Sequence, residues 1–218
     1  MEKCRDEYIK MLVYANNCFA GFLYRQLNQL ANHPFMWGSF DMISHPDHYI
    51  NFISHYNIEN FRHFTIEDET DPVRLQWMAA HDPTRKYPVF AFKEFKYRFT
   101  HYIYGDFEEP HVHGIDVLVN RPDMYALFKY SKRLPRIPCV DPTFIVHFNE
   151  TCPTDSRIIK KICSIPNKRL IIVCRHPSEF ATAVQFRDKN KLIIKHDSGM
   201  EIPDICQQNL NKISKFVI

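Results

Sequence analysis

Residues 143–174 read TFIVHFNETCPTDSRIIKKICSIPNKRLIIVC and carry the clearest fold signal in the chain. The two ends of this stretch, Thr143–Phe148 and Arg169–Cys174, are short apolar runs typical of strands that are buried on both faces. The segment between them, Thr154–Cys163, is predicted to be a helix. Alternating strands and helices favour a parallel or mixed sheet with helices on both faces. We therefore predict an α/β fold, a three-layer sandwich with a parallel or mixed central sheet.

The same pattern extends in both directions. Ile9–Ala15 (IKMLVYA) is predicted to be a buried strand, followed by a turn at Asn16-Asn17 and a helix after Cys18. We expect Ile9–Ala15, Thr143–Phe148 and Arg169–Cys174 to be the central strands. Toward the carboxyl terminus, Lys191–His196 is predicted to be a strand and Asp204–Ser214 a helix.

The middle of the chain adds further expected elements, and neither an internal repeat nor a long linker divides it. They are a helix capped by Ser44 with Pro46 in its first turn, a strand at Phe61–Ile66, a helix from Asp71-Pro72 to about Ala80, a long strand or hairpin at Val89–Tyr104, and a helix over Arg121–Arg136 that Pro135 ends. We predict a single domain over residues 1–218.

Composition limits the function. The 218 residues are 45% hydrophobic and 24% charged, as in ordinary globular proteins, and five glycines leave little material for a glycine-rich phosphate loop. A net charge of +3 is too small to favour nucleic acid as a partner. The charged start MEKCRDEYIK is unlike an export signal, and the seven cysteines form no CxxC pair. We expect a cytoplasmic protein with every thiol reduced.

The turn Asn16-Asn17-Cys18 is the first candidate site, because ligands bind beyond the carboxyl ends of strands in α/β sheets. A cysteine in the first turn of a helix faces the positive end of the helix dipole, which would lower its pKa. Cys18 is then a candidate nucleophile, with His101, near the end of the long strand, as its base. The alternative is that Cys18 is a small buried side chain and that the asparagines only shape the turn.

Two arginines form a second candidate. Arg133 and Arg136 share a helix face, and guanidinium groups suit phosphate or carboxylate ligands, although both residues could equally lie in a solvated last turn. His111 and His113 have the spacing of a metal pair but lie in an acidic stretch, where solvated side chains are the simpler interpretation. The chain has no Walker loop, GxGxxG, HExxH or DxD motif. We predict neither a metal site nor a cofactor.

Several segments together resemble a bacterial family of exopolysaccharide-biosynthesis proteins of unknown function. YANNCFAGFLYRQL matches the family's opening at Asn16, Asn17, Cys18 and Gly21, although Phe19 stands where tryptophan is usual. Further matches are HPFMWGSFDMISHPDHYINFI, the strand end with Phe99, His101 and Tyr102, YSKRLPRI with Arg133, Arg136 and Ile137, and the closing strand-helix-strand unit. Tyr130 and Pro135 depart from the pattern. The resemblance spans most of residues 9–177.

The resemblance implies a role in making capsule, exopolysaccharide or O-antigen. We expect a glycosyl or related group transferase that uses a phosphate-activated donor, with Cys18 and His101 as catalytic residues and Asn16, Asn17, Tyr102, Arg133 and Arg136 as ligand-binding residues. Its partners would be an activated sugar or other phosphate-containing small molecule and a glycan acceptor, through which it could associate with the membrane surface. Cys18, His101 and at least one arginine would border one pocket.

Two alternatives stay open. The cysteine-centred opening is also similar to that of a family of papain-like cysteine peptidases, which implies a thiol hydrolase or acyltransferase with Cys18 as nucleophile. The sequence shows no complete catalytic constellation, which favours a non-catalytic glycan-binding or scaffold module.

Overall fold

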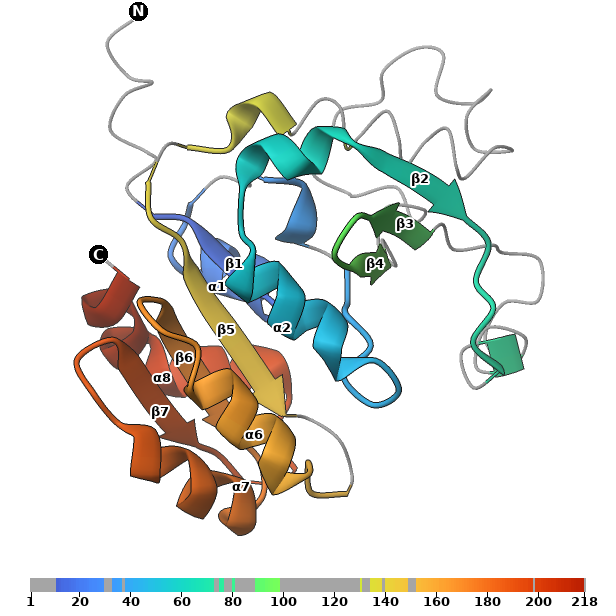
Figure 1. The fold of residues 1–218 in the computed structure, drawn as a ribbon. Coiled ribbons are helices and arrows are strands. Elements are labelled where there is room, and N and C mark those ends of the chain that lie inside the picture. Colours follow the sequence, from blue (N-terminus) through green and yellow to red (C-terminus); the bar gives the residue numbers. More distant parts are fainter. Residues whose placement is uncertain are drawn as a thin grey trace, which may run out of the picture.

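A computed structural model describes residues 11–29, 33–36, 38–72, 75–76, 80, 89–98, 130, 134–138, 140–148, 152–197 and 199–217. The strands of these residues form two sheets (Figure 1). One has four parallel strands in the order β1-β5-β6-β7, namely Val13–Ala15, Thr143–Phe148, Arg169–Cys174 and Lys191–Lys195. The other has three antiparallel strands in the order β2-β3-β4, namely Phe64–Glu67, Val89–Phe92 and Lys96–Arg98. The fold is therefore mixed α/β, as the sequence predicts.

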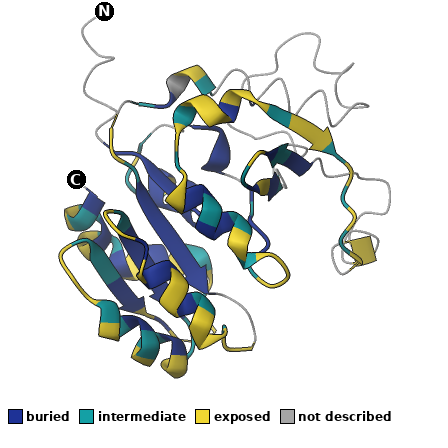
Figure 2. Ribbon diagram, viewed as in Figure 1, coloured by how far each residue is buried: buried dark blue, intermediate teal, exposed yellow. Residues whose placement is uncertain are grey.

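Helices cover both faces of the parallel sheet (Figure 1). Helices α1 (Phe19–Gln26) and α8 (Ile202–Val217) pack together on one face, against Ile145, Ile171 and Ile194. The other face carries Phe144, Val146 and Ile172 and is covered by α2 (Pro46–Ser54), α6 (Ser156–Cys163) and α7 (Pro177–Ala183). Alternate residues of β5 and β6 thus enter different cores, and these strands are buried throughout apart from Arg169 (Figure 2).

The antiparallel sheet packs on α2 through aromatic side chains. Phe35, in the 3₁₀ turn Pro34–Met36, contacts the rings of Phe52, Phe61 and Tyr97 with centroid separations of 5.5, 4.9 and 5.0 Å. Two further 3₁₀ turns, Ile58–Arg62 and Leu134–Arg136, flank this core, and a third, Val184–Phe186, follows α7. Most aromatic side chains of the described residues therefore fill the core.

The elements with continuous apolar runs are predicted well. The bounds of β5 and β6 are confirmed, and α1, α6, β7 and α8 lie where expected within a few residues. The interpretation of Val89–Tyr104 as a hairpin is confirmed over its described part, because β3 and β4 pair antiparallel. The helices expected from Asp71 to Ala80 and over Arg121–Arg136 lie largely outside the described residues.

Several expectations differ from the structure. The strand expected at Phe61–Ile66 is β2 at Phe64–Glu67, because Phe61 and Arg62 belong to the preceding 3₁₀ turn. The predicted strand Ile9–Ala15 is described only as β1, which lies at an edge of the parallel sheet rather than at its centre. Its residues are nonetheless fully buried, because α1 and the aromatic core cover them, so their apolar character did not distinguish an edge from a centre. Helix α2 is preceded by His45 rather than capped by Ser44. Helix α7 was not predicted.

The expectation of reduced thiols is met in the described part of the chain. Cys18, Cys152, Cys163, Cys174 and Cys206 are free thiols, while Cys4 and Cys139 lie outside the described residues. Among the described helices, none has the length and apolar character that crossing a membrane requires.

Candidate functional site

The carboxyl ends of the four parallel strands gather polar side chains from distant parts of the sequence. Asn16 and Asn17 follow β1, His147 is the next-to-last residue of β5, Arg175 follows β6 and His196 follows β7. Because parallel strands end at the same edge of a sheet, their following loops meet there, and this edge is where α/β folds bind ligands.

Asn16 fixes the backbone of this edge. The Oδ1 atom of Asn16 accepts a hydrogen bond from the backbone N–H of His147 at 2.7 Å, and its Nδ2 donates to the carbonyl of His147 at 3.0 Å. Asn16 is buried, with 2% of its surface exposed. The side chain therefore continues the pairing of β1 with β5 beyond the last residue of β1, and it sets the position of His147.

Asn17 contacts the ring of the same histidine. Its Nδ2 atom lies 3.1 Å from Nδ1 of His147, while its Oδ1 accepts a hydrogen bond from the backbone N–H of Phe19 at 3.1 Å. On the other side of the ring, Nε2 of His147 lies 3.4 Å from Nε2 of His196. The Nδ1 atom of His196 is 2.9 Å from the carbonyl oxygen of Asp197. These contacts form one continuous chain of polar groups.

Both histidines are uncharged near neutral pH. Burial, together with the nearby His196 and the charge of Arg175, lowers the pKa of His147 to about 3. Burial also lowers the pKa of His196, and Arg175 adds to this effect, whereas the contact with the Asp197 carbonyl and the charges of Glu179 and Asp197 oppose it. Each neutral ring then offers one N–H donor and one acceptor nitrogen.

A cavity of about 360 Å³ opens beside this pair and is called here the carboxyl-edge cavity. It is lined by His147, Arg175, His196 and the segment Gly199–Ile202, where helix α8 begins. The backbone of Arg175 is held by Glu179 of α7, whose buried carboxylate accepts hydrogen bonds from the N–H groups of Thr154, Arg175 and His176 at 2.9, 3.0 and 3.0 Å. The volume of the carboxyl-edge cavity lies within the range of small-molecule sites.

Cys18 does not have the character expected of a nucleophile. It precedes α1 as expected, but the side chain is partly buried, and burial raises the pKa of its thiol to about 12. The dipole argument gave the opposite direction, because it ignored the loss of solvation that disfavours a thiolate. Cys18 is also not among the residues that line the carboxyl-edge cavity.

Most other predicted site residues lie where the structure says nothing about them. His101, Tyr102 and Arg133 are outside the described residues, and only the backbone of Arg136 is described, in the turn Leu134–Arg136. The described part of the strand that leads to His101 does not pair with β1. Strand β4 belongs to the separate antiparallel sheet. The predicted pocket of Cys18, His101 and an arginine therefore stays a prediction.

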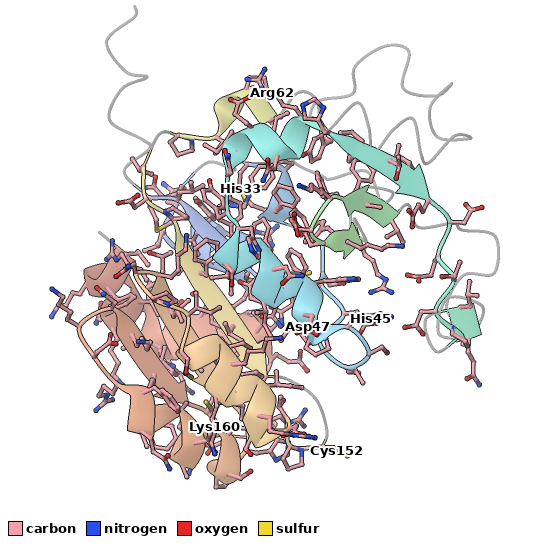
Figure 3. All side chains as sticks on the ribbon, viewed as in Figure 1. His33, His45, Asp47, Arg62, Cys152 and Lys160 are labelled. Atoms are coloured by element: carbon pink, nitrogen blue, oxygen red, sulfur yellow. The ribbon has the colours of Figure 1, made fainter. Side chains whose placement is uncertain are left out.

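Two other cavities lie away from this edge. A cavity of about 460 Å³ beside the antiparallel sheet is lined by Arg98 and several acidic residues. The guanidinium group of Arg98 forms an ion pair with Glu69, and its Nη1 lies 3.5 Å from Oδ2 of Asp41. His45 and Asp47, labelled in Figure 3, lie at the start of α2 near this cavity, and His45 lines it. A third cavity of about 560 Å³ lies before β6 and β7, at the amino ends of the strands. The position of the 360 Å³ cavity at the carboxyl edge makes it the better candidate.

His147, Arg175 and His196 were not among the site residues predicted from the sequence. Their signal was present, because each stands at the end of a correctly predicted strand, as Asn16 and Asn17 do. Applying the carboxyl-edge rule to every strand, rather than to the first alone, would have found them.

Within the described part of the chain, no group of three or more His, Cys, Asp or Glu side chains is arranged to hold a metal ion. Comparisons of the chain with known protein families, with curated proteins and with solved structures found no match. The resemblance to exopolysaccharide-biosynthesis proteins therefore stays a prediction.

Proposed function

We propose that the carboxyl-edge cavity binds a phosphate-containing small molecule, and that the protein is a group-transfer enzyme, glycosyl or related, of cell-surface polysaccharide biosynthesis. The observation that carries the proposal is the convergence of Arg175, His147, His196 and the start of α8 on one cavity beyond the ends of the parallel strands. The pathway comes from the sequence resemblance alone, as does the glycan acceptor.

The lining of the cavity suits an anion held by hydrogen bonds. A guanidinium group matches the geometry of phosphate oxygens, and Arg175 brings this group to the wall of the cavity. The 16-residue helix α8 begins at the same wall, where the positive end of its dipole favours negative charge. Glu201 is the acidic residue of the lining and is exposed, so solvent screens its charge.

The thiol-enzyme alternative is less well supported. A cysteine nucleophile reacts as the thiolate, and a thiol whose pKa is about 12 is almost wholly protonated at neutral pH. The cytoplasmic location belongs to this proposal, and the five free cysteines of the described residues favour it.

Ligand-dependent stabilisation tests the proposal. We would measure the melting temperature with inorganic phosphate, pyrophosphate, a nucleoside diphosphate and nucleotide sugars, using sodium chloride at equal ionic strength as the blank. A ligand at 100 times its Kd should stabilise the protein by about 2.7 kcal/mol.

Two matched variants locate the binding site. Arg175→Gln should abolish the stabilisation, whereas Arg187→Gln, an exposed arginine at the opposite edge of the sheet, should retain it. The proposal is wrong if no phosphate compound stabilises the wild-type protein, or if both variants respond as the wild type does.

A further inference from the structure

The orientation of the Asn17 side chain is settled by its two contacts. Its Oδ1 accepts a hydrogen bond from the backbone N–H of Phe19 at 3.1 Å, a role that the amide nitrogen cannot fill. The Nδ2 atom must therefore face Nδ1 of His147, 3.1 Å away. Because an amide nitrogen only donates, Nδ1 of His147 is the acceptor of this hydrogen bond, and the ring carries its proton on Nε2.

The tautomer of His196 follows from the other end of the chain. Its Nδ1 lies 2.9 Å from the carbonyl oxygen of Asp197, which only accepts, so Nδ1 carries the proton. The Nε2 atom of neutral His196 then has a lone pair, and it lies 3.4 Å from Nε2–H of His147. All the hydrogen bonds run in one direction, from Asn17 through His147 and His196 to Asp197.

We propose that Asn17 is a positioning residue that locks His147 as the Nε2–H tautomer, which makes His196 the catalytic base of the carboxyl-edge cavity, acting on a hydroxyl-bearing acceptor. The inference rests on the proposed group-transfer function for the identity of the substrate, but not for the tautomers. Both histidines line the cavity, and both are largely buried, with 2% of the surface of His147 and 6% of that of His196 exposed. The acceptor class follows from the pattern of donors and acceptors.

Only a group that both accepts and donates a hydrogen bond can enter between the two rings without leaving one of them unsatisfied. A hydroxyl accepts from Nε2–H of His147 and donates to Nε2 of His196, with the rings moving apart to admit it. An ammonium group cannot accept, and a fully ionised phosphate oxygen cannot donate. A sugar hydroxyl or a water molecule fits, whereas an ammonium group does not.

Transfer of a group from the phosphate compound to the acceptor hydroxyl needs no further reactant. The acceptor hydroxyl gives its proton to Nε2 of His196, and its oxygen forms the new bond to the transferred group. The bond between that group and the phosphate oxygen breaks, and the phosphate leaves with the electron pair. Arg175, on the same wall, stabilises the charge that develops on the leaving phosphate.

The hydrogen bond from Asn17 to Nδ1 of His147 disfavours a divalent metal between the two rings, although the spacing of the rings would allow one. A spacing of 3.4 Å between two Nε2 atoms fits tetrahedral zinc with Zn–N bonds of about 2.0–2.1 Å. A metal on Nε2 of His147 would require the ring proton on Nδ1, where it would face the Nδ2–H of Asn17. An aspartate at position 17 would instead accept from Nδ1–H, the arrangement that supports metal-bound histidines.

Nitrogen NMR of the ligand-free, ¹⁵N-histidine-labelled protein tests the tautomers directly. His33 is an internal reference, since its Nδ1 accepts from the backbone N–H of Phe35 and its Nε2 donates to the carbonyl of Val13. We expect His147 to show the same Nε2–H pattern as His33 and His196 to show the Nδ1–H pattern at pH 7.

Two further measurements complete the test. As the pH is lowered, His196 should be protonated while His147 is still neutral, because a proton on Nδ1 of His147 would face the Asn17 amide. The titratable and charged groups around His196 are His147, Arg175, Glu179 and Asp197. In Asn17→Asp, His147 should change to the Nδ1–H tautomer, and Co²⁺ should bind with a tetrahedral visible spectrum that the wild type lacks.

The inference is wrong if His147 of the wild type carries its proton on Nδ1, if His147 titrates before His196, or if Asn17→Asp leaves the tautomer unchanged. These results are independent of phosphate binding. Confirmed tautomers without stabilisation by phosphate compounds would overturn the proposed function and, with it, the role of His196 as base. Stabilisation by phosphate compounds without the expected tautomers would overturn the roles of Asn17 and His196 but not the proposed function.

Discussion

Asn16 and His147 are 131 positions apart, yet the side chain of Asn16 makes both backbone hydrogen bonds of His147 at the end of β1. The amide of Asn16 replaces the peptide group that a longer β1 would have supplied. This pairing leaves the chain free to turn at Asn17 while β5 stays fixed. The geometry of the His147 ring therefore depends on two adjacent asparagines with different tasks, one for the backbone and one for the ring.

Replacing Asn16 should destabilise the protein. Asn16→Ala leaves the backbone N–H and carbonyl of His147 buried without these partners, which is expected to lower the free energy of unfolding by about 2–4 kcal/mol. Urea denaturation monitored by circular dichroism would measure the loss. Asn211→Ala, on the exposed surface of α8, is the control and should change stability by less than about 0.5 kcal/mol. Equal stabilities of Asn16→Ala and wild type would contradict the importance of this pairing.

The pH dependence of stability should report the buried histidine. The pKa of His147 is lowered from 6.5 to about 3 in the folded protein, so the unfolded state binds a proton first as the pH falls. Its contribution is therefore complete above pH 6.5 and is lost between pH 6.5 and 3, at up to about 1.4 kcal/mol per pH unit. Lowered carboxylate pKa values, such as that of Glu69, act in the same direction.

A comparison of variants isolates this contribution. The loss of stability between pH 6.5 and 4 should be smaller in His147→Gln than in the wild type. His63→Gln, at an exposed position, should lose as much as the wild type. Identical pH profiles for His147→Gln and wild type would show that His147 is already protonated in the folded protein or does not contribute.

The sequence predicts the parallel sheet because its strands are buried on both faces. Runs such as RLIIVC have no polar face, and the polar residues around them mark where each strand begins and ends. The same property hides the order of the strands, since an edge strand covered by helices is as apolar as a central one, as β1 shows. Helix α7 has seven residues and only one buried apolar residue, Ala183, so it carries no clear helical periodicity.

The candidate site is harder to predict than the fold. Asn16 and Asn17 were selected for the correct reason, their place after a strand, but their partner His147 lies inside an apolar run, where a histidine looks like a core residue. The direction of the Cys18 pKa depended on burial, which the sequence does not show. Contacts between residues 130 positions apart come from the strand order, and only the structure gives that order.

Glu179 should be essential for the loop that presents Arg175. Its buried carboxylate accepts three backbone hydrogen bonds, and Glu179→Gln would turn one acceptor atom into a donor facing those N–H groups. We expect a decrease in the free energy of unfolding of about 1.5–3 kcal/mol, measured by thermal or urea denaturation. Glu59→Gln, at an exposed glutamate, is the control. A stability equal to that of the wild type would contradict the role assigned to Glu179.

Gly38 should tolerate no side chain. A Cβ atom at this position would lie 2.2 Å from the carbonyl oxygen of Arg98 and 2.6 Å from the ring of Tyr97. Ser39 and Arg98 exchange backbone hydrogen bonds of 2.9 and 3.0 Å, so the two segments cannot separate without losing them. Gly38→Ala should lower the melting temperature by several degrees or prevent folding, at a loss of at least about 1–3 kcal/mol. Gly199→Ala, which meets nothing within 4 Å, should melt like the wild type.

Cys18 should react slowly with alkylating reagents in the folded protein. Burial raises the pKa of its thiol to about 12, so the reactive thiolate is rare at pH 7.5, whereas Cys152 is exposed to solvent. Iodoacetamide labelling followed by mass spectrometry should modify Cys152 at least about tenfold faster than Cys18. In 6 M guanidinium chloride the two rates should become similar, which serves as the control for peptide detection. Rapid labelling of Cys18 in the folded protein below pH 7 would contradict the raised pKa and would restore the thiol-enzyme interpretation.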